Sequence, residues 1–135
     1  MPIALSIVTP SGAAYEGDVD AVVLPGSEGD FGVLPEHERF LCPLRIGEVQ
    51  IRTGGRTVYA AIADGFADVS ATRVSVLVDS CELAADIDTA RAELAVRRAE
   101  QDLAELPRDE EASRVAGYEA ALARARNWLE VSRHG

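Results

Sequence analysis

The sequence predicts a two-domain β + α protein, in which an antiparallel β-sandwich (a flattened barrel) precedes an antiparallel two-helix hairpin. Up to about residue 80, apolar residues alternate with period two, which is typical of half-buried strands. From Ile87 onward they recur every three or four positions, which is typical of amphipathic helices. Glycine and proline punctuate the first region and nearly vanish from the second. The expected domains are residues 1–85 and residues 86–135.

The predicted strands are short alternating runs with turn residues between them. The clearest runs lie at residues 3–7, 48–52, 58–62 and 74–78. Gly54 and Gly55 separate two of these runs, and they predict a tight hairpin because glycine enters positive φ freely. Several short strands at this spacing favour a sandwich or a flattened barrel.

The predicted helices each carry one apolar seam. The first seam comprises Ala92, Ala95, Ala99, Leu103 and Leu106, and the second comprises Val115, Tyr118, Leu122, Ala125 and Leu129. Pro107 is expected to end the first helix, and Glu110 and Glu111 suit the first turn of the second. The short connection predicts antiparallel helices. A seam built largely of alanine buries little area, so the hairpin is expected to open and redock.

The composition and charge of the chain argue against several classes of function. A formal charge of −10 argues against a nucleic-acid binder and against binding to anionic lipid. No apolar run approaches the ~20 residues that span a bilayer, so direct membrane insertion is not expected, and no signal peptide is recognised. Cys42 and Cys81 match neither a metal motif nor a disulfide framework, which predicts buried, reduced thiols.

The residues that would serve an enzyme are sparse. His37 stands alone as a candidate, because His134 lies next to the C-terminus, where chains usually fray. No nucleophile elbow, phosphate-binding loop or dinucleotide motif is present, and the carboxylates are scattered. The sequence therefore predicts no catalytic residues and no metal site.

Residues 23–37 carry, in order, a Pro-Gly pair, a Gly-acidic-apolar-Gly turn and a Leu-Pro-x-His sequence. Further matching segments lie at residues 8–12, 54–55, 65–69 and 86–92. In order and spacing these segments resemble the epsilon subunits of rotary ATP synthases of the bacterial and chloroplast type. Glu36 departs from that family, in which many members have glycine before the histidine.

The resemblance implies a non-catalytic rotor subunit of the central stalk, peripheral to the cytoplasmic face of the bacterial inner membrane. The sandwich would bind the gamma subunit and rest on the c-ring. The hairpin would either fold against the sandwich or extend along gamma towards the catalytic alpha and beta subunits and restrain ATP hydrolysis.

A first candidate site is the glycine-rich loop that the resemblance places on the c-ring. It comprises Ser27, Glu28, Gly29, Asp30, Phe31 and Gly32. The alternative is an ordinary hairpin turn with an exposed Asp30, which needs no partner.

A second candidate site comes from epsilon subunits that bind regulatory ATP in the folded hairpin. The matching positions here are Glu82, Ile87, Asp88, Arg91, Ala92 and Arg124. Asp88 could accept a hydrogen bond from adenine, and Arg91 and Arg124 could bind the phosphates. The alternative is that Asp88 is an ordinary N-cap and pairs with Arg91 three residues later. ATP binding is expected to be weak, because Trp128 occupies the position four residues after Arg124, where nucleotide-sensing relatives have a second arginine.

The second helix also has a local positive charge. Its four arginines are Arg114, Arg124, Arg126 and Arg133, against Glu119 and Glu130. This excess suits an acidic partner surface, although a solvated helix face explains it equally well. Three hypotheses therefore remain: a rotor subunit, a nucleotide-sensing module and, least supported, a β-sandwich enzyme.

Overall fold

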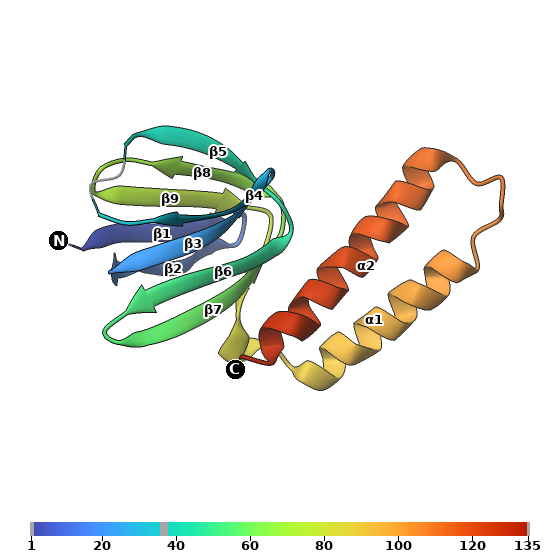
Figure 1. The fold of residues 1–135 in the computed structure, drawn as a ribbon. Coiled ribbons are helices and arrows are strands. Elements are labelled where there is room, and N and C mark those ends of the chain that lie inside the picture. The colour runs from blue at the N-terminus through green and yellow to red at the C-terminus, as the bar shows by residue number, and fades with distance from the viewer. Residues whose placement is uncertain (1, 36–37, 135) are drawn as a thin grey trace.

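The computed structural model describes residues 2–35 and 38–134, so Glu36 and His37 lie outside the described residues. These residues form a β-sandwich followed by two long helices (Figure 1). The strands are β1 (Ile3–Thr9), β2 (Gly12–Val19), β3 (Ala21–Gly26), β4 (Gly29–Val33), β5 (Phe40–Leu44), β6 (Gly47–Thr53), β7 (Arg56–Ile62), β8 (Gly65–Val69), β9 (Arg73–Val78) and β10 (Cys81–Leu83). The predicted sandwich-then-hairpin fold is confirmed.

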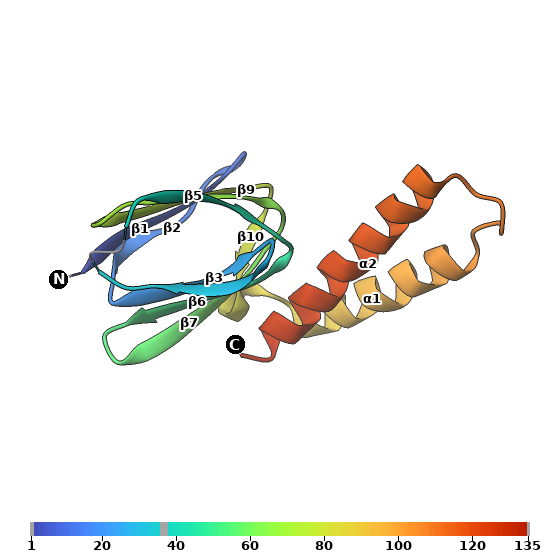
Figure 2. The ribbon, with the colours of Figure 1, turned by 45° about the horizontal axis from the view of Figure 1, so that its top comes forward.

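The strands form one continuous sheet that folds over into two layers (Figure 2). One layer runs β10-β7-β6-β3, with β4 on β3, and the other runs β5-β8-β9-β1-β2. A single residue pair, Gly26 with Leu44, joins the layers between β3 and β5. Among the described residues one pair departs from the predicted antiparallel arrangement, because β1 and β9 are parallel. These two strands are far apart in sequence, so no tight turn forces them to run in opposite directions.

The core of the sandwich follows the predicted alternation. Val74, Val76 and Val78 on β9 are buried, whereas Leu77 between them is exposed. The buried side chains of both layers form one cluster that extends from β1 to β9. Gly54 and Gly55 connect β6 to β7 with φ of 59° and 79°, which confirms the predicted glycine hairpin.

The hairpin consists of α1 (Thr89–Ala104) and α2 (Ala112–Ser132), preceded by a short 3-10 turn, η1 (Ala84–Asp86). Both predicted seams lie between the helices, where Ala92 is the most buried residue of α1. α1 ends at Ala104 with Glu105 as its C-cap, and Pro107 follows two residues later, a position where proline is common because it cannot continue a helix. Beyond Ala104, the Glu105 N–H still bonds to the Gln101 carbonyl four residues back, and the Leu106 N–H bonds to the Leu103 carbonyl over the shorter three-residue span.

The hairpin packs on the sandwich through one end only, and the chain returns to β6 and β7 at its C-terminus (Figure 1). Val131 of α2 is buried there against Ala61 and Ala84. Cys42 and Cys81 are free thiols, but both are half-buried rather than fully buried as predicted, since each lies on a strand at the margin of the core.

Candidate functional site

A cavity of about 580 Å³ lies where the hairpin leaves the sandwich. Five of the six predicted nucleotide-site residues line it: Glu82, Ile87, Asp88, Arg91 and Ala92. They come from β10, the linker after η1 and the first turn of α1. The linker carries Asp88 into the N-cap position of α1, so residues from three elements meet around one hollow.

The sixth predicted residue, Arg124, is not among the residues that line this cavity. It is partly buried in α2, and Trp128, one helical turn later, lines the cavity instead. Trp128 also packs against the small apolar cluster around Val131. The indole therefore takes part both in the cavity wall and in the junction with the sandwich.

The charges of the cavity are mixed. Glu82, Asp86 and Asp88 contribute carboxylates, and Arg91 and Arg98 contribute guanidinium groups. Asp88 Oδ1 accepts a hydrogen bond of 3.3 Å from the backbone N–H of Arg91, so Asp88 acts as the N-cap of α1. This contact is the helix N-cap that the sequence offered as the alternative role of Asp88.

Arg98 was missed by the sequence analysis. It lies seven residues after Arg91, and a spacing of seven places two side chains on one face of a helix. That spacing was the available signal, since both arginines line the cavity. Two arginines on one face can contact the phosphates of a bound ligand with charge-assisted hydrogen bonds.

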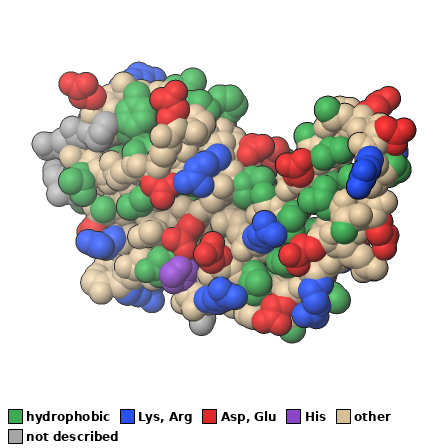
Figure 3. Space-filling model, turned by 45° about the vertical axis from the view of Figure 1, so that its right-hand side comes forward, with side chains coloured by type: hydrophobic (Ala, Val, Ile, Leu, Met, Phe, Trp, Pro, Cys, Tyr) green, Lys and Arg blue, Asp and Glu red, His purple; other side chains and the backbone are tan. Residues whose placement is uncertain are grey.

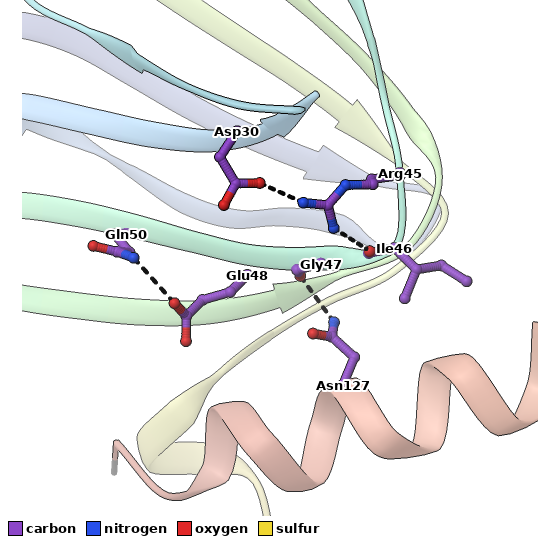
Figure 4. Close-up of polar contacts among 7 residues, drawn as sticks. All are labelled: Asp30, Arg45, Ile46, Gly47, Glu48, Gln50 and Asn127. Carbon is purple, nitrogen blue, oxygen red and sulfur yellow. Dashed lines mark hydrogen bonds and ion pairs between the residues drawn. The ribbon is translucent and has the colours of Figure 1, made fainter. Parts of the chain in front are cut away.

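The predicted c-ring loop comprises the turn at Ser27 and Glu28 and the first four residues of β4. Ser27, Glu28 and Gly29 are exposed at its tip, where Gly29 has φ of 136°. Asp30 forms an ion pair with Arg45 from the connection between β5 and β6 (Figure 4). Arg45 lies fifteen residues away in the sequence, so no local pattern predicted it. The tip therefore presents Asp30 already paired with a cation.

Phe31 and the glycine after it complete the predicted loop. The Phe31 ring meets the edge of Phe40 with 5.5 Å between ring centroids, which fixes the loop against β5. Gly32 is exposed and pairs with Val23 of β3. The loop is therefore rigid at its base and exposed at its tip.

Three large apolar side chains are exposed on the outer face of β5, β8 and β9. Leu41 is 68% exposed, Phe66 is 54% exposed and Leu77 is 57% exposed. Phe66 and Leu77 are cross-strand partners, and Pro43 is the partner of Phe66 on β5. We call Leu41, Phe66 and Leu77 the apolar patch. A patch of neighbouring apolar side chains is a common sign of a protein interface.

A shallow cavity of about 640 Å³ adjoins the apolar patch, and Asp64 and Asp79 lie at its edge. Carboxylates beside apolar side chains suit a partner that offers apolar residues flanked by basic ones. Elsewhere, acidic and basic side chains are interspersed over the hairpin and the adjoining part of the sandwich (Figure 3).

His134 is ordered, so the expectation that it frays is wrong. Its ring stacks on Tyr59 with 3.7 Å between centroids, and its Nε2 lies 2.7 Å from Glu48 Oε1. The frayed-terminus expectation failed because α2 ends against β6 and β7 rather than in solvent.

Known proteins share this architecture over the whole chain. The family described as "ATP synthase, Delta/Epsilon chain, beta-sandwich domain" matches residues 2–84. The family described as "ATP synthase, Delta/Epsilon chain, long alpha-helix domain" matches residues 85–133. Among the described helices, none is long and apolar enough to cross a membrane.

Curated relatives agree with the family matches. The ATP synthase epsilon chain of Bacillus cytotoxicus is 43% identical over 128 residues, which cover 95% of this chain and 94% of the relative. The epsilon chain of Nitratidesulfovibrio vulgaris is 45% identical over 123 residues, covering 90% and 92%. The epsilon chain of Halalkalibacterium halodurans is 38% identical over 128 residues, covering 95% of each chain.

Solved structures show the same fold at low identity. A chain of the Euglena gracilis mitochondrial ATP synthase superposes with a TM-score of 0.81 at 23% identity, covering 98% of this chain and 82% of that one. A chain of the Tetrahymena thermophila mitochondrial ATP synthase central stalk and c-ring superposes with a TM-score of 0.65 at 10% identity. The match covers 98% of this chain and 97% of that one.

The fold and its exposed surfaces define a small assembly subunit: a sandwich body with a helical appendage. The sequence matches cover nearly the whole chain, so they identify one family. The chain belongs to the ATP synthase epsilon chain family.

Proposed function

We propose that this chain is a non-catalytic rotor subunit that joins the gamma subunit to the c-ring and restrains ATP hydrolysis through its hairpin. It works on the cytoplasmic face of a bacterial inner membrane, as a peripheral part of the ATP synthase. The observation that carries this proposal is the apolar patch on a sandwich whose core is already filled without it.

The gamma subunit binds over the apolar patch. Leu41, Phe66 and Leu77 lie on neighbouring strands, so one partner surface covers all three. Asp64 and Asp79 beside them favour basic residues at the margin of that surface. Burying three large apolar side chains that are more than half exposed supplies favourable free energy for a permanent contact.

The c-ring contacts the turn between β3 and β4. This turn is next to the apolar patch, because the Ser27 N–H donates to the carbonyl of Pro43, 3.0 Å away, and Pro43 borders the patch. One edge of the sandwich thus serves both partners. The Asp30–Arg45 pair offers the ring a carboxylate and a guanidinium side by side.

The hairpin supplies the regulation. It packs on the sandwich through one end only, so it can detach without disturbing the sandwich core. When extended, α2 brings arginines to the catalytic alpha and beta subunits. Removal of residues 87–135 from the assembled enzyme is expected to raise the hydrolysis rate or leave it unchanged, while coupling survives.

A pull-down with the gamma subunit tests the gamma contact. Leu77→Asp places a charge in the apolar patch and is expected to abolish capture by gamma. Leu94→Asp is the matched control, because Leu94 is 59% exposed on α1, away from the apolar patch. Equal capture of both variants would remove the basis of the gamma contact.

A nucleotide-sensing module is the second candidate, favoured by the cavity at the base of the hairpin. Arg91 and Arg98 can contact phosphates, and Trp128 can stack on a base. Three carboxylates line the same cavity and oppose phosphate binding, which limits the affinity. Calorimetric titration of the chain with ATP tests this candidate, and absence of heat at millimolar ATP excludes it.

A further inference from the structure

The C-terminal end of α2 contacts the sandwich at three successive points. Asn127 and Val131 lie on one face of α2, and His134 lies in the turn after the helix, where its N–H bonds to the Val131 carbonyl at 3.0 Å. We propose that these three residues form a latch that holds the hairpin against the sandwich without any nucleotide. The latch is a property of the free chain, and it stands independently of the rotor role.

The first latch contact is a hydrogen bond to a fixed carbonyl. Asn127 Nδ2 donates to the Gly47 carbonyl oxygen at 2.8 Å (Figure 4). The same Nδ2 lies 3.5 Å from the Ile62 carbonyl oxygen. Gly47 and Ile62 are paired at the end of β6 and β7. A Cβ at Gly47 would lie 2.6 Å from Pro25 Cβ, so this backbone is closely packed and its carbonyl is rigid.

The second latch contact is apolar. Val131 is 1% exposed and lies in one cluster with Ala61 of β7 and Ala84 of η1. Tyr59 and Trp128 pack around the same cluster. Val131 thus anchors the junction with a buried apolar contact between two polar contacts that line a cavity of about 690 Å³.

The third latch contact is made by His134 with two neighbouring strands. Its ring stacks on Tyr59 of β7 with 10° between the ring planes, and its Nε2 meets Glu48 Oε1 of β6. The other oxygen, Glu48 Oε2, accepts a hydrogen bond of 3.1 Å from Gln50 Nε2. The carboxylate is therefore already oriented when His134 reaches it (Figure 4).

The latch is separate from the nucleotide cavity. Asn127, Val131 and His134 do not line that cavity, and their partners belong to the sandwich and η1. Because Asn127 and Val131 lie on α2 and His134 lies in the turn directly after it, release of the hairpin breaks the three contacts together. Docking is therefore cooperative, and it needs no ligand to bridge the two parts of the chain.

The test uses the full chain without nucleotide and its single tryptophan. Trp128 is partly buried beside the latch, so undocking exposes it to quenching by acrylamide. Asn127→Ala and His134→Ala are each expected to shift the docked-to-undocked ratio about two- to tenfold towards the undocked form. Arg133→Ala is the matched control, since Arg133 is exposed in the same turn, and it is expected to leave quenching unchanged.

A double substitution separates a direct contact from a general loss of structure. Glu48→Gln and His134→Ala remove the same interaction, so their combined effect is expected to be smaller than the product of the single effects. Strictly independent effects would overturn the His134–Glu48 contact. Quenching of Asn127→Ala and His134→Ala equal to that of Arg133→Ala would overturn the latch.

Discussion

The sandwich and the hairpin differ in how much apolar surface each buries within itself. In the sandwich, buried residues from both layers form one continuous core. In the hairpin, Ala92, Leu122 and Ala125 are the buried residues of the seam, and most other seam positions remain half-exposed. A seam so rich in alanine lets the helices approach closely but buries little apolar area. The sandwich is therefore expected to stay folded by itself, as a permanent scaffold. The hairpin is conditional, because its docked arrangement depends on contacts with the sandwich.

The first prediction compares equivalent truncations in the two parts. Ile51 is fully buried in the sandwich, so Ile51→Ala is expected to lower the free energy of unfolding by about 2–5 kcal/mol. Leu122→Ala removes a side chain that is buried in the hairpin seam but lies outside the sandwich core, so it is expected to leave the free energy of unfolding of the sandwich within about 0.5 kcal/mol. Urea unfolding followed by near-ultraviolet circular dichroism measures both, with the exposed Leu41→Ala as control.

An equal loss of stability in Ile51→Ala and Leu122→Ala would show that the sandwich and the hairpin unfold as one unit. It would contradict the distinction between scaffold and appendage.

The second prediction concerns ATP affinity at the base of the hairpin. Trp128 lines the cavity, so Trp128→Arg adds a third guanidinium to it. A charge-assisted bond to phosphate contributes ~1.5–3 kcal/mol, so the variant is expected to bind ATP about ten- to a hundredfold more tightly than the original chain. Trp128→Ala is the matched control, because it removes the indole without adding charge.

The same titration ranks the two candidate arginines. Arg98 lines the cavity and Arg124 does not, so Arg98→Gln is expected to weaken ATP binding about tenfold and Arg124→Gln to change it little. Calorimetry measures both variants. The reverse ranking would favour the set of residues inferred from the family resemblance, and it would require α2 to turn when ATP binds.

Much of the fold was predictable because it depends on periodicity. The alternation at residues 74–78 and the two helical seams predicted the buried faces correctly. The exposed apolar patch was also predictable from Leu77. This residue is apolar at a strand position that faces outward, where a polar residue is usual. Such a residue predicts a partner surface.

The missed contacts depend on register and docking, which no local pattern encodes. Arg45 meets Asp30 because the turns between β3 and β4 and between β5 and β6 lie side by side. His134 is ordered because α2 ends against β6 and β7. These contacts join segments that are 15 and 86 residues apart, beyond the reach of periodicity.

The third prediction uses Cys81, on the strand that precedes the hairpin. Burial, and secondly the Glu82 carboxylate, raise the pKa of the Cys81 thiol from 9.0 to about 11. At pH 8 this lowers the thiolate fraction roughly a hundredfold, while the higher basicity raises the nucleophilicity of each thiolate about eightfold. Alkylation is therefore expected to be about tenfold slower than for an exposed thiol of ordinary pKa.

Iodoacetamide labelling of Cys42→Ser, which leaves Cys81 as the remaining thiol, measures this rate by mass spectrometry. Cys81 packs against the sandwich core, so removal of the hairpin is expected to leave the rate unchanged. Faster labelling after removal would mean that the hairpin, rather than the sandwich, protects this strand.

The last prediction removes the hairpin altogether and expects the smallest effect. A chain ending at Ala85 keeps every strand of the described sheet, from β1 to β10, and the whole sandwich core. It loses the latch and exposes Ala61 and Ala84, which are small side chains. We expect cooperative unfolding, with a Tm within about 8 °C of the full chain, since ~1 kcal/mol shifts a domain of this size by 4–8 °C.

The truncated chain is also expected to bind the gamma subunit, because the apolar patch lies entirely on β5, β8 and β9. Val131→Ala in the full chain is the control, since it weakens docking without shortening the chain. Broad, non-cooperative melting of the truncated chain would show that the sandwich needs the hairpin to fold. Sharp melting without capture by gamma would instead show that the hairpin contributes to the gamma contact. Either result would refute the division into a permanent scaffold and a conditional hairpin.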